Sequence, residues 1–305
     1  MASNIIAVVL VTYNRSELLK KSLNQLFYDN QDKPERLYLI DNNSNDNTVQ
    51  VVQEFTEKFS NIKYIRLDKN VGGAGGFEYG VRKAFDDGAD WIVLIDDDVL
   101  LTDQCLKILK SNLSIRCFIG VREDLLGSLV ELGALKTDYK NPFRLNPKVL
   151  SLKDAYESVD NLPNVVEVES GSFEGFFVHR SVVKSVGFPN KEYFIFGDDT
   201  DYSIRIRRSG YQIYAVKEAR VVRQLPYTEP NYVDWKFCYR WRNFFVLHFL
   251  YGENFLVKLK PFYLFTGLLI ICLKNGNPFK AITILLDALK LAKQIKLKIQ
   301  FYNRN

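Results

Sequence analysis

Short apolar runs alternate with amphipathic segments up to about residue 222, and this alternation constrains the fold more than any other feature. The runs have the length and β-branched content of buried strands, and the segments between them carry apolar residues at helical spacing. A repeated strand–helix–strand order predicts a mostly parallel sheet with helices on both faces. The predicted strands are residues 5–11, 37–40, 62–67, 91–95, 117–121 and 165–169; the predicted helices are residues 16–28, 46–59, 77–85, a segment from 181, and 201–208.

A change of composition after residue 225 predicts a second region. We expect an α/β domain over residues 1–225, loop-rich between 124 and 164, and a helical appendage over residues 226–305. In the appendage an aromatic-rich helix at 235–250 precedes an apolar run at 262–273, which is shorter than the roughly 20 residues needed to cross a bilayer. A last helix follows Pro278, with a predicted apolar stripe of Ile282, Leu285, Leu286, Leu289 and Ile295.

The positive charge of the chain is concentrated in this appendage. The net charge is +5, and from Val257 onward nine Lys or Arg residues stand against a single acid, Asp287. Lysines interleaved with apolar helix residues favour an anionic membrane surface, so residues 257–305 are predicted to lie on one. The alternative is packing onto the α/β domain or onto a second subunit, as a homo-oligomer. The apolar residues between the lysines argue against binding to nucleic acid.

Cysteine and histidine usage excludes several kinds of site. The four cysteines have no CxxC or metal-binding spacing, which indicates reduced thiols in a reducing compartment. Two histidines exclude a multi-histidine metal site. The N-terminus runs straight into strand-like sequence without a basic leader, so we expect no signal peptide.

Three consecutive carboxylates, Asp96, Asp97 and Asp98, end the predicted strand at residues 91–95. Ligands of open α/β sheets bind beyond the carboxyl ends of strands. Neighbouring like charges resist joint ionisation unless a cation or hydrogen-bond donors neutralise them. A hard divalent ion shared with a diphosphate would explain both the position and the charge. A solvated acidic turn or a helix N-cap is the alternative.

Three further turns follow predicted strands. The first, Thr12-Tyr13-Asn14-Arg15, offers backbone amides, an aromatic ring and a cation. The second begins at Asp41, whose carboxylate can accept from a base or from ribose hydroxyls; the asparagines after it also suit a plain turn. The third, residues 70–76, holds clustered glycines that allow a ligand close to the backbone. The dinucleotide fingerprint needs glycines in the first turn, so a Rossmann dehydrogenase is excluded.

A second acidic cluster follows the aromatic residues at 194–196. Asp198 and Asp199 stand at the start of a predicted short helix, whose N-terminal dipole tolerates negative charge. One structural explanation is a helix cap, with Asp201 pairing Arg205 at i,i+4. The functional explanation is that this cluster supplies a general base for an incoming hydroxyl.

The ordered motifs VTYNR (11–15), DNNSNDNT (41–48), NVGGAGGF (70–77), IDDDV (95–99) and FGDDTDYSIR (196–205) resemble family 2 glycosyltransferases of the GT-A fold. The resemblance covers residues 5–223. It is greatest to bacterial galactofuranosyltransferases that build cell-wall or capsular polysaccharide, with rhamnosyltransferases close behind. It implies a Rossmann-like, mostly parallel sheet flanked by helices, with the appendage added.

The resemblance also implies roles for particular residues. Asp96 and Asp98 occupy the DXD positions that bind Mn²⁺ or Mg²⁺ with the diphosphate, and Asp97 reaches the ribose. Asp199 occupies the position of the catalytic base, beside Asp198. The acceptor site is expected at Phe173, Glu174 and Phe176. The remaining residues implied to bind the nucleotide sugar are Thr12, Tyr13, Asn14, Arg15, Asp41, Asn43, Asn70, Gly72 and Gly73.

One position departs from the family pattern. Many relatives have a metal-ligating histidine after the last strand, and this chain has Arg223 there. Arginine does not ligate a metal ion but pairs with a diphosphate, so the resemblance implies weaker metal affinity and a nucleotide-binding role for Arg223.

We therefore expect an inverting glycosyltransferase that uses a UDP-sugar, with UDP-galactofuranose as the first candidate and dTDP-rhamnose as the alternative. The expected acceptor is a lipid-linked glycan in bacterial surface polysaccharide synthesis. The expected location is cytoplasmic, peripheral on the inner face of the cell membrane. The rival functions are a nucleotidyltransferase, which would need a Gly-rich basic first turn, and a non-catalytic module that binds a sugar nucleotide.

Overall fold

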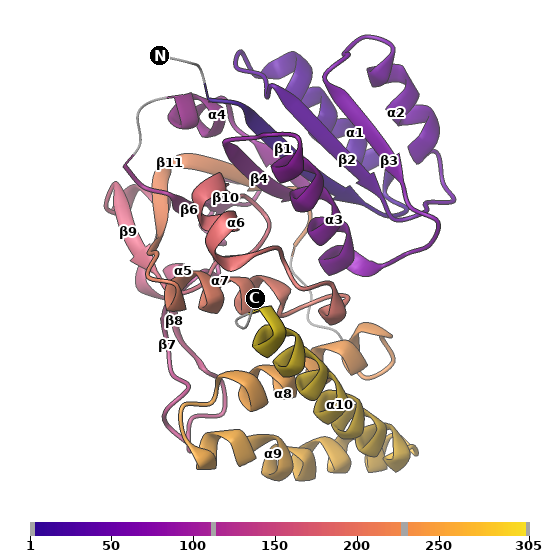
Figure 1. Ribbon diagram of the computed structural model, residues 1–305, viewed down its shortest axis with the longest axis vertical. Coiled ribbons are helices and arrows are strands. Elements are labelled where there is room, and N and C mark those ends of the chain that lie inside the picture. Colours follow the sequence, from indigo (N-terminus) through magenta and orange to yellow (C-terminus); the bar gives the residue numbers. More distant parts are fainter. Residues whose placement is uncertain (1–3, 111–113, 227–230, 303–305) are drawn as a thin grey trace. The chain divides into compact units, whose positions relative to one another are not determined.

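A computed structural model describes residues 4–110, 114–226 and 231–302 (Figure 1). The chain divides into two compact units. Unit 1 comprises Met1–Lys136, Leu150–Lys191 and Asp199–Pro226, and unit 2 comprises Thr137–Val149, Glu192–Asp198 and Tyr227–Asn305. Unit 2 therefore takes in two short stretches from the predicted α/β domain as well as the C-terminal helices.

Unit 1 is built on one twisted sheet that begins with four parallel strands. In spatial order these are β3 (Ile62–Arg66), β2 (Arg36–Asp41), β1 (Ile6–Thr12) and β4 (Trp91–Asp96). The sheet continues through β10 (Phe176–His179), antiparallel to both neighbours, and then β6 (Cys117–Glu123), β11 (Ile213–Arg223) and β5 (Val99–Leu101), while β9 (Val165–Val168) pairs with β11.

Alternate residues of β1 explain why helices cover both faces of this sheet. Ile6, Val8 and Leu10 belong to one core cluster. That cluster includes residues of α1 (Ser16–Asn24), α2 (Thr48–Thr56) and α4 (Asp103–Lys110). The intervening residues of β1 pack on the other side with α3 (Gly72–Asp86), α6 (Arg180–Val186) and α7 (Asp198–Arg208). A strand buried on both faces is uniformly apolar, as β1 is.

The predicted elements of unit 1 are present, and the structure adds others. The predicted strands did not include β5, β10 or β11; the first two residues of β10 lay in the stretch assigned to the acceptor. The loop-rich stretch contains a two-stranded sheet of β7 (Ala134–Thr137) and β8 (Lys148–Ser151), the short helix α5 (Leu152–Ala155) and a 3₁₀ turn at Val159–Asn161. The first helix ends in a π-helical turn, Gln25–Asp29.

Unit 2 packs three helices against one another: α8 (Lys236–Tyr251), α9 (Phe255–Lys274) and α10 (Pro278–Tyr302). The stretch Thr137–Val149 belongs to the same unit. Three of its carbonyl oxygens accept hydrogen bonds from side chains at or near the start of α9. The Lys140 carbonyl accepts from Asn254 Nδ2, that of Arg144 from Lys260 Nζ at 2.6 Å, and that of Pro142 from Tyr263 OH at 2.6 Å. Backbone groups of a connecting segment thereby find donors on α9.

The structure corrects the length predicted for the apolar segment of the appendage and shows which residues of the predicted stripe are exposed. Helix α9 is 20 residues long, because it begins at Phe255, before the apolar run predicted at 262–273, and continues through Pro261. It is the one helix among the described residues whose length and composition would allow it to cross a membrane. On α10 the buried stripe includes Ala281, Ile284, Ala288 and Ile295, whereas three residues of the predicted stripe, Ile282, Leu286 and Leu289, are exposed.

Candidate active site

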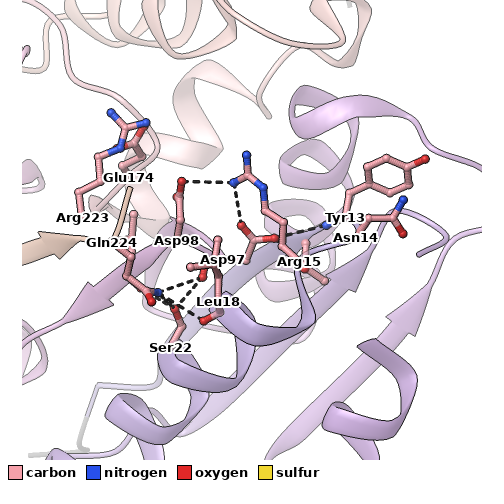
Figure 2. A network of polar contacts seen from close by, with 12 residues as sticks. Tyr13, Asn14, Arg15, Leu18, Ser22, Asp97, Asp98, Glu174, Arg223 and Gln224 are labelled. Atoms are coloured by element: carbon pink, nitrogen blue, oxygen red, sulfur yellow. Dashed lines mark hydrogen bonds and ion pairs between the residues drawn. The ribbon is translucent and has the colours of Figure 1, made fainter. Parts of the chain in front are cut away.

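The three carboxylates lie where β4 ends, beside the turn that follows β1. The two strands are parallel neighbours with Val11 opposite Asp96. Asp97 accepts from the Thr12 hydroxyl at 2.8 Å and from the Tyr13 amide at 3.4 Å. One nitrogen of Arg15, Nη1, lies 3.1 Å from Asp97 and 3.2 Å from Asp98 (Figure 2). The structure thus joins five of the predicted nucleotide-binding and metal-binding positions directly.

The negative charge of these three carboxylates is compensated only in part by neighbouring cations and hydrogen-bond donors, so their pKa values are raised. Burial, then Asp98 and Glu174, hold the pKa of Asp96 well above its usual value. Burial raises the pKa of Asp97 to about 6, although Arg15 and the Thr12 hydrogen bond oppose this. Burial and the nearby Glu174 also raise the pKa of Asp98. Such a site gains stability from any added cation.

A chain of alternating charges adjoins Asp98 on the other side from Arg15 (Figure 2). Arg223 Nε lies 3.4 Å from Glu174, and the same Glu174 oxygen accepts from Arg122. Arg122 in turn forms a two-pronged pair with Glu131, at 2.9 and 3.1 Å. Burial alone would raise the pKa of Glu174, but the charges of Arg122 and Arg223 outweigh burial and hold this pKa below its usual value.

Glu174 was predicted at the acceptor site, and the structure gives it these two arginine partners. Arg122 and Glu131 were not predicted at all. The sequence does hold a signal for Arg122: it directly follows the apolar strand residues 117–121. A charge at the end of a buried strand needs a partner, because isolated buried charges are rarely tolerated. Ser22 and Gln224 were missed as well; both donate to the main-chain oxygen of Asp97, at 2.8 and 3.4 Å.

The turn after β2 is ordered by its own side chains. Asp41 is fully buried and accepts from the Ser44 amide at 2.8 Å and the Tyr64 hydroxyl at 2.7 Å. Asn14, with φ 52°, donates through its backbone amide to Ser44 Oγ at 2.9 Å. Asn43, with φ 65°, is bonded to the Asp68 carbonyl. The contact of Asp41 and Asn43 with a nucleotide stays a prediction.

The glycine cluster is the first turn of α3, not a loop before a helix at residue 77. Asn70 accepts from the amide of Gly72, which has φ 75°. A Cβ on Gly76 would come within 2.7 Å of Val11, and one on Gly80 within 2.3 Å of Val9. These two glycines therefore serve close packing of α3 on β1. A Cβ on Gly73 would meet nothing within 4 Å.

Asp198 and Asp199 begin α7 as predicted. Asp199 accepts from the backbone amide of Thr200 at 2.6 Å. Asp201, fully buried, pairs with Arg205 at 2.9 Å, which confirms the predicted i,i+4 contact. The same arginine donates to the carbonyls of Val186 and Phe188. Asp201 therefore anchors the helix.

Phe173 and Phe176 are not available to a sugar ring. Phe176 is fully buried on β10, and Phe173 packs edge-on against Phe77, Phe176 and Tyr202. Both rings belong to the core beneath α3 and α7. The prediction that they lie at the acceptor site is corrected on this point, because β10 places Phe176 inside the sheet and the surrounding aromatic rings cover Phe173.

The carboxylate cluster fits a hard divalent cation that is shared with a diphosphate. Asp96 and Asp98 offer oxygen ligands whose charge is incompletely balanced. Within the described residues, no three His, Cys, Asp or Glu side chains are grouped to hold a metal alone. Mg²⁺ is commonly bound by one or two carboxylates together with phosphate and water oxygens, so two carboxylates suffice here if the substrate completes the site.

Comparisons with known proteins agree with this geometry. Residues 7–122 match the family model described as Glycosyl transferase family 2. The galactofuranosyltransferase GlfT1 of Mycolicibacterium smegmatis is 30% identical over 220 residues, which cover 68% of this chain and 67% of that protein. The chain belongs to glycosyltransferase family 2. The resemblance drawn from the five motifs is thereby confirmed.

Two further similarities, one in sequence and one in fold, were found for this family 2 chain. The dTDP-rhamnosyl transferase RfbF of Shigella flexneri is 25% identical over 223 residues, covering 73% of this chain and 69% of that protein. The crystal structure of GalNAc-T7 with UDP, GalNAc and Mn²⁺ has a TM-score of 0.59 at 14% identity, covering 83% of this chain and 49% of that one. The predicted GT-A fold is confirmed.

Proposed function

We propose that this chain is an inverting glycosyltransferase that moves a sugar from a nucleotide-diphosphate donor to a glycan. The observation that carries the proposal is the carboxylate cluster at the end of β4, flanked by the cations Arg15 and Arg223. A UDP-sugar is the favoured donor and UDP-galactofuranose the first candidate, in line with the similarity to GlfT1. The alternative donor, dTDP-rhamnose, is in line with the similarity to RfbF.

The residues around β1 and β4 are proposed to bind the donor. Thr12, Tyr13 and Asn14 border the nucleotide, with Asp41 and Asn43 toward the base and Asp97 toward the ribose. Asp96 and Asp98 would hold Mn²⁺ or Mg²⁺ against the diphosphate. When bound, that ion supplies positive charge that stabilises the departing diphosphate. Asn70, Gly72 and Gly73 line the sugar side.

The reaction follows as a single displacement. The acceptor hydroxyl oxygen attacks the anomeric carbon from the face opposite the diphosphate, the bond from that carbon to the diphosphate oxygen breaks, and the configuration inverts. The hydroxyl proton passes to Asp199, with Asp198 beside it. Arg15 and Arg223 balance the charge that grows on the leaving diphosphate; preorganised cations of this kind lower the barrier without rearrangement.

The first test is the thermal stability of the protein with UDP, dTDP and GDP, each with Mn²⁺ and with EDTA. A ligand at 100 times its Kd adds about 2.7 kcal/mol to the free energy of unfolding. We expect stabilisation by UDP that depends on the metal. Stabilisation by dTDP instead would select the rhamnose donor. If no nucleotide stabilises the protein, the proposed site is wrong.

The acceptor is proposed to be lipid-linked, with the protein peripheral on the cytoplasmic face of a membrane. On α10 the residues Phe279, Ile282, Leu286 and Leu289 recur at i, i+3, i+4 spacing and are all exposed. They form a second apolar stripe besides the one that packs on the other helices. Exposed lysines continue along the same helix: Lys290, Lys293, Lys296 and Lys298.

The polar contacts of α9 favour lying on a membrane over crossing it. Lys260 is fully buried and donates to the Arg144 carbonyl, and Tyr263 donates to the Pro142 carbonyl. A helix that spans a bilayer would lose these partners, and unsatisfied polar groups in hydrocarbon cost several kcal/mol each. Exposed apolar side chains beside lysines are the features of an interfacial helix.

Liposome co-flotation tests the membrane contact. Ile282→Glu with Leu286→Glu should release the protein from liposomes that contain anionic lipid. The control is Thr283→Glu, an exposed neighbour on α10 outside the stripe. Equal flotation of the stripe variant and the wild type would exclude this surface and favour a contact with a second copy, which light scattering would detect.

A further inference from the structure

The segment that leads into Asp199 has an unusual backbone. Phe194 has φ 66°, Phe196 has φ 65° and Gly197 has φ 82°. The left-handed region is uncommon for residues other than glycine and is energetically unfavourable for bulky ones. Such conformations persist only where the surroundings determine them, and they gather at functional sites. Two aromatic residues in this region, five and three positions before Asp199, need a support.

One side chain of α8 supplies most of that support. Asn243 is 1% exposed, and its Nδ2 donates to the carbonyl oxygens of Tyr193 at 3.0 Å, Ile195 at 2.7 Å and Phe196 at 2.8 Å. These carbonyls belong to the strained turn itself. The two hydrogens of this one amide nitrogen are therefore shared among three carbonyls of the turn.

The neighbouring Arg242 fixes the orientation of that amide. Its Nε donates to Asn243 Oδ1 at 2.8 Å, which leaves Nδ2 as the end that faces the turn. Its Nη2 donates to the Tyr193 carbonyl at 2.7 Å. A flipped amide would place an oxygen against three carbonyl oxygens and a nitrogen against the guanidinium. The pair thus specifies one arrangement.

The ring of Phe194 is held from the same helix. It stacks on Tyr239 with the ring centroids 4.8 Å apart and the planes 20° apart, and Trp235 meets both rings edge-on. Stacking of this kind stabilises a ring pair beyond what its burial contributes. Both the backbone and the side chain of the turn are therefore set by the first half of α8.

We propose that Asn243, oriented by Arg242, is the positioning residue of the catalytic base: it holds residues 193–197 in the strained conformation that delivers Asp199 to the acceptor hydroxyl. The inference rests on the proposed role of Asp199 as the base. Asn243 touches no reacting atom. It acts through the backbone, so its loss displaces the base without removing it.

The test is Asn243→Asp, which keeps the shape and turns the donor end into a repelling oxygen. Misplacing a catalytic group by about 1 Å costs about 10²-fold in rate, so we expect kcat for transfer to fall by about that factor. The nucleotide should stabilise the variant as it does the wild type. The pH profile of kcat should still fall at low pH, because the base is still present, but its plateau should be lower.

Asn275→Asp is the matched control: Asn275 also donates to a carbonyl, that of Ile271, but on the exposed end of α9. Should Asn243→Asp fail to fold, Arg242→Met carries the test, since it leaves Asn243 without its orienting donor. Loss of transfer with intact nucleotide stabilisation supports the inference, and wild-type turnover in the folded variant overturns it. Asp199→Asn separates the two proposals: if that protein is active, the role of the base itself fails.

Discussion

The two acidic segments of the molecule are held by different kinds of interaction. Asp97 and Asp98 are held by charge, since Arg15 bridges them and Arg223 lies beside Asp98. The segment before Asp199 is held by neutral donors, chiefly the amide of Asn243 on three carbonyls. The charged arrangement suits the proposed donor site, because the diphosphate of the donor brings negative charge when it binds. The second suits a base that must keep its position while it takes up a proton.

The difference predicts that the two regions fail differently. Removing a charge beside Asp98 leaves other buried charges uncompensated and affects stability as well as binding. Changing the neutral support of Asp199 affects geometry and leaves the nucleotide site intact. The predictions below test that separation.

The largest effect is expected for Asp199→Asn. The amide cannot accept the acceptor proton, and loss of a general base costs about 10²–10⁴-fold, so transfer should fall by that factor. Nucleotide-induced stabilisation should equal that of the wild type. Asp86→Asn, at the exposed end of α3, is the control. Turnover near the wild-type rate would remove Asp199 from the role of base.

The next effect concerns the charged side of the comparison. Arg122→Met leaves Glu131 buried without its cation and Glu174 with Arg223 alone, and breaking a buried pair costs about 3–5 kcal/mol. Chemical denaturation should show a loss of unfolding free energy of that size. Arg220→Met also removes two ion pairs, with Glu123 and Asp160, but that side chain is 38% exposed, so the loss should be at most about 1 kcal/mol. Equal losses would contradict the ionic account.

The sequence predicted the charged region better than the neutral one, for a physical reason. Asp96–Asp98 and Arg15 are side chains whose chemistry is visible in the letters, and the strand order places them at one edge. The acceptors that Asn243 binds are backbone carbonyls, which every residue has. Neither their strained geometry nor the asparagine that binds them leaves a pattern in the sequence, so Asp199 could be proposed from the sequence whereas its support could not.

Two outcomes depend on tertiary partners that local signals do not show. The rings of Phe173 and Phe176 suggested a sugar platform, yet both are buried: Phe176 lies on β10 between β4 and β6, and Phe173 packs against other aromatic rings. On α10 the predicted apolar stripe left membrane contact and packing open, and the structure buries Ile295 while Ile282 and Leu286 are exposed. Spacing alone identified these side chains as apolar, but not which of them other elements cover.

A third prediction concerns α8, the helix that supports Asp199. His248 is fully buried there, near Tyr139 and Lys260, with Nδ1 on the Phe244 carbonyl. Burial lowers its pKa from 6.5 to about 4. Between these values the unfolded chain binds more protons, so stability rises with pH and is lost as pH falls from 6.5 toward 4, by about 3 kcal/mol at most.

Denaturation of wild type and His248→Gln at a series of pH values measures this contribution as the difference between the two curves. The wild type should lose more stability than the variant below pH 6.5. The chain has two histidines, and His179→Gln is the control; since His179 is only half-buried, its curve should stay closer to the wild type. Parallel curves for wild type and His248→Gln would show that His248 is protonated without cost in the folded protein.

The smallest effects separate packing from ligand binding in the glycine cluster of α3. Gly80→Ala places a methyl group 2.3 Å from Val9, and overpacking costs about 1–3 kcal/mol; its nucleotide-induced stabilisation should be retained. Gly73→Ala meets no neighbour and should gain up to about 1 kcal/mol from helix propensity. If Gly73 lines the donor pocket, that stabler variant should show a smaller melting shift with UDP and Mn²⁺. A full shift would exclude Gly73 from the donor pocket and leave Asn70 and Gly72 as the proposed donor contacts of this turn.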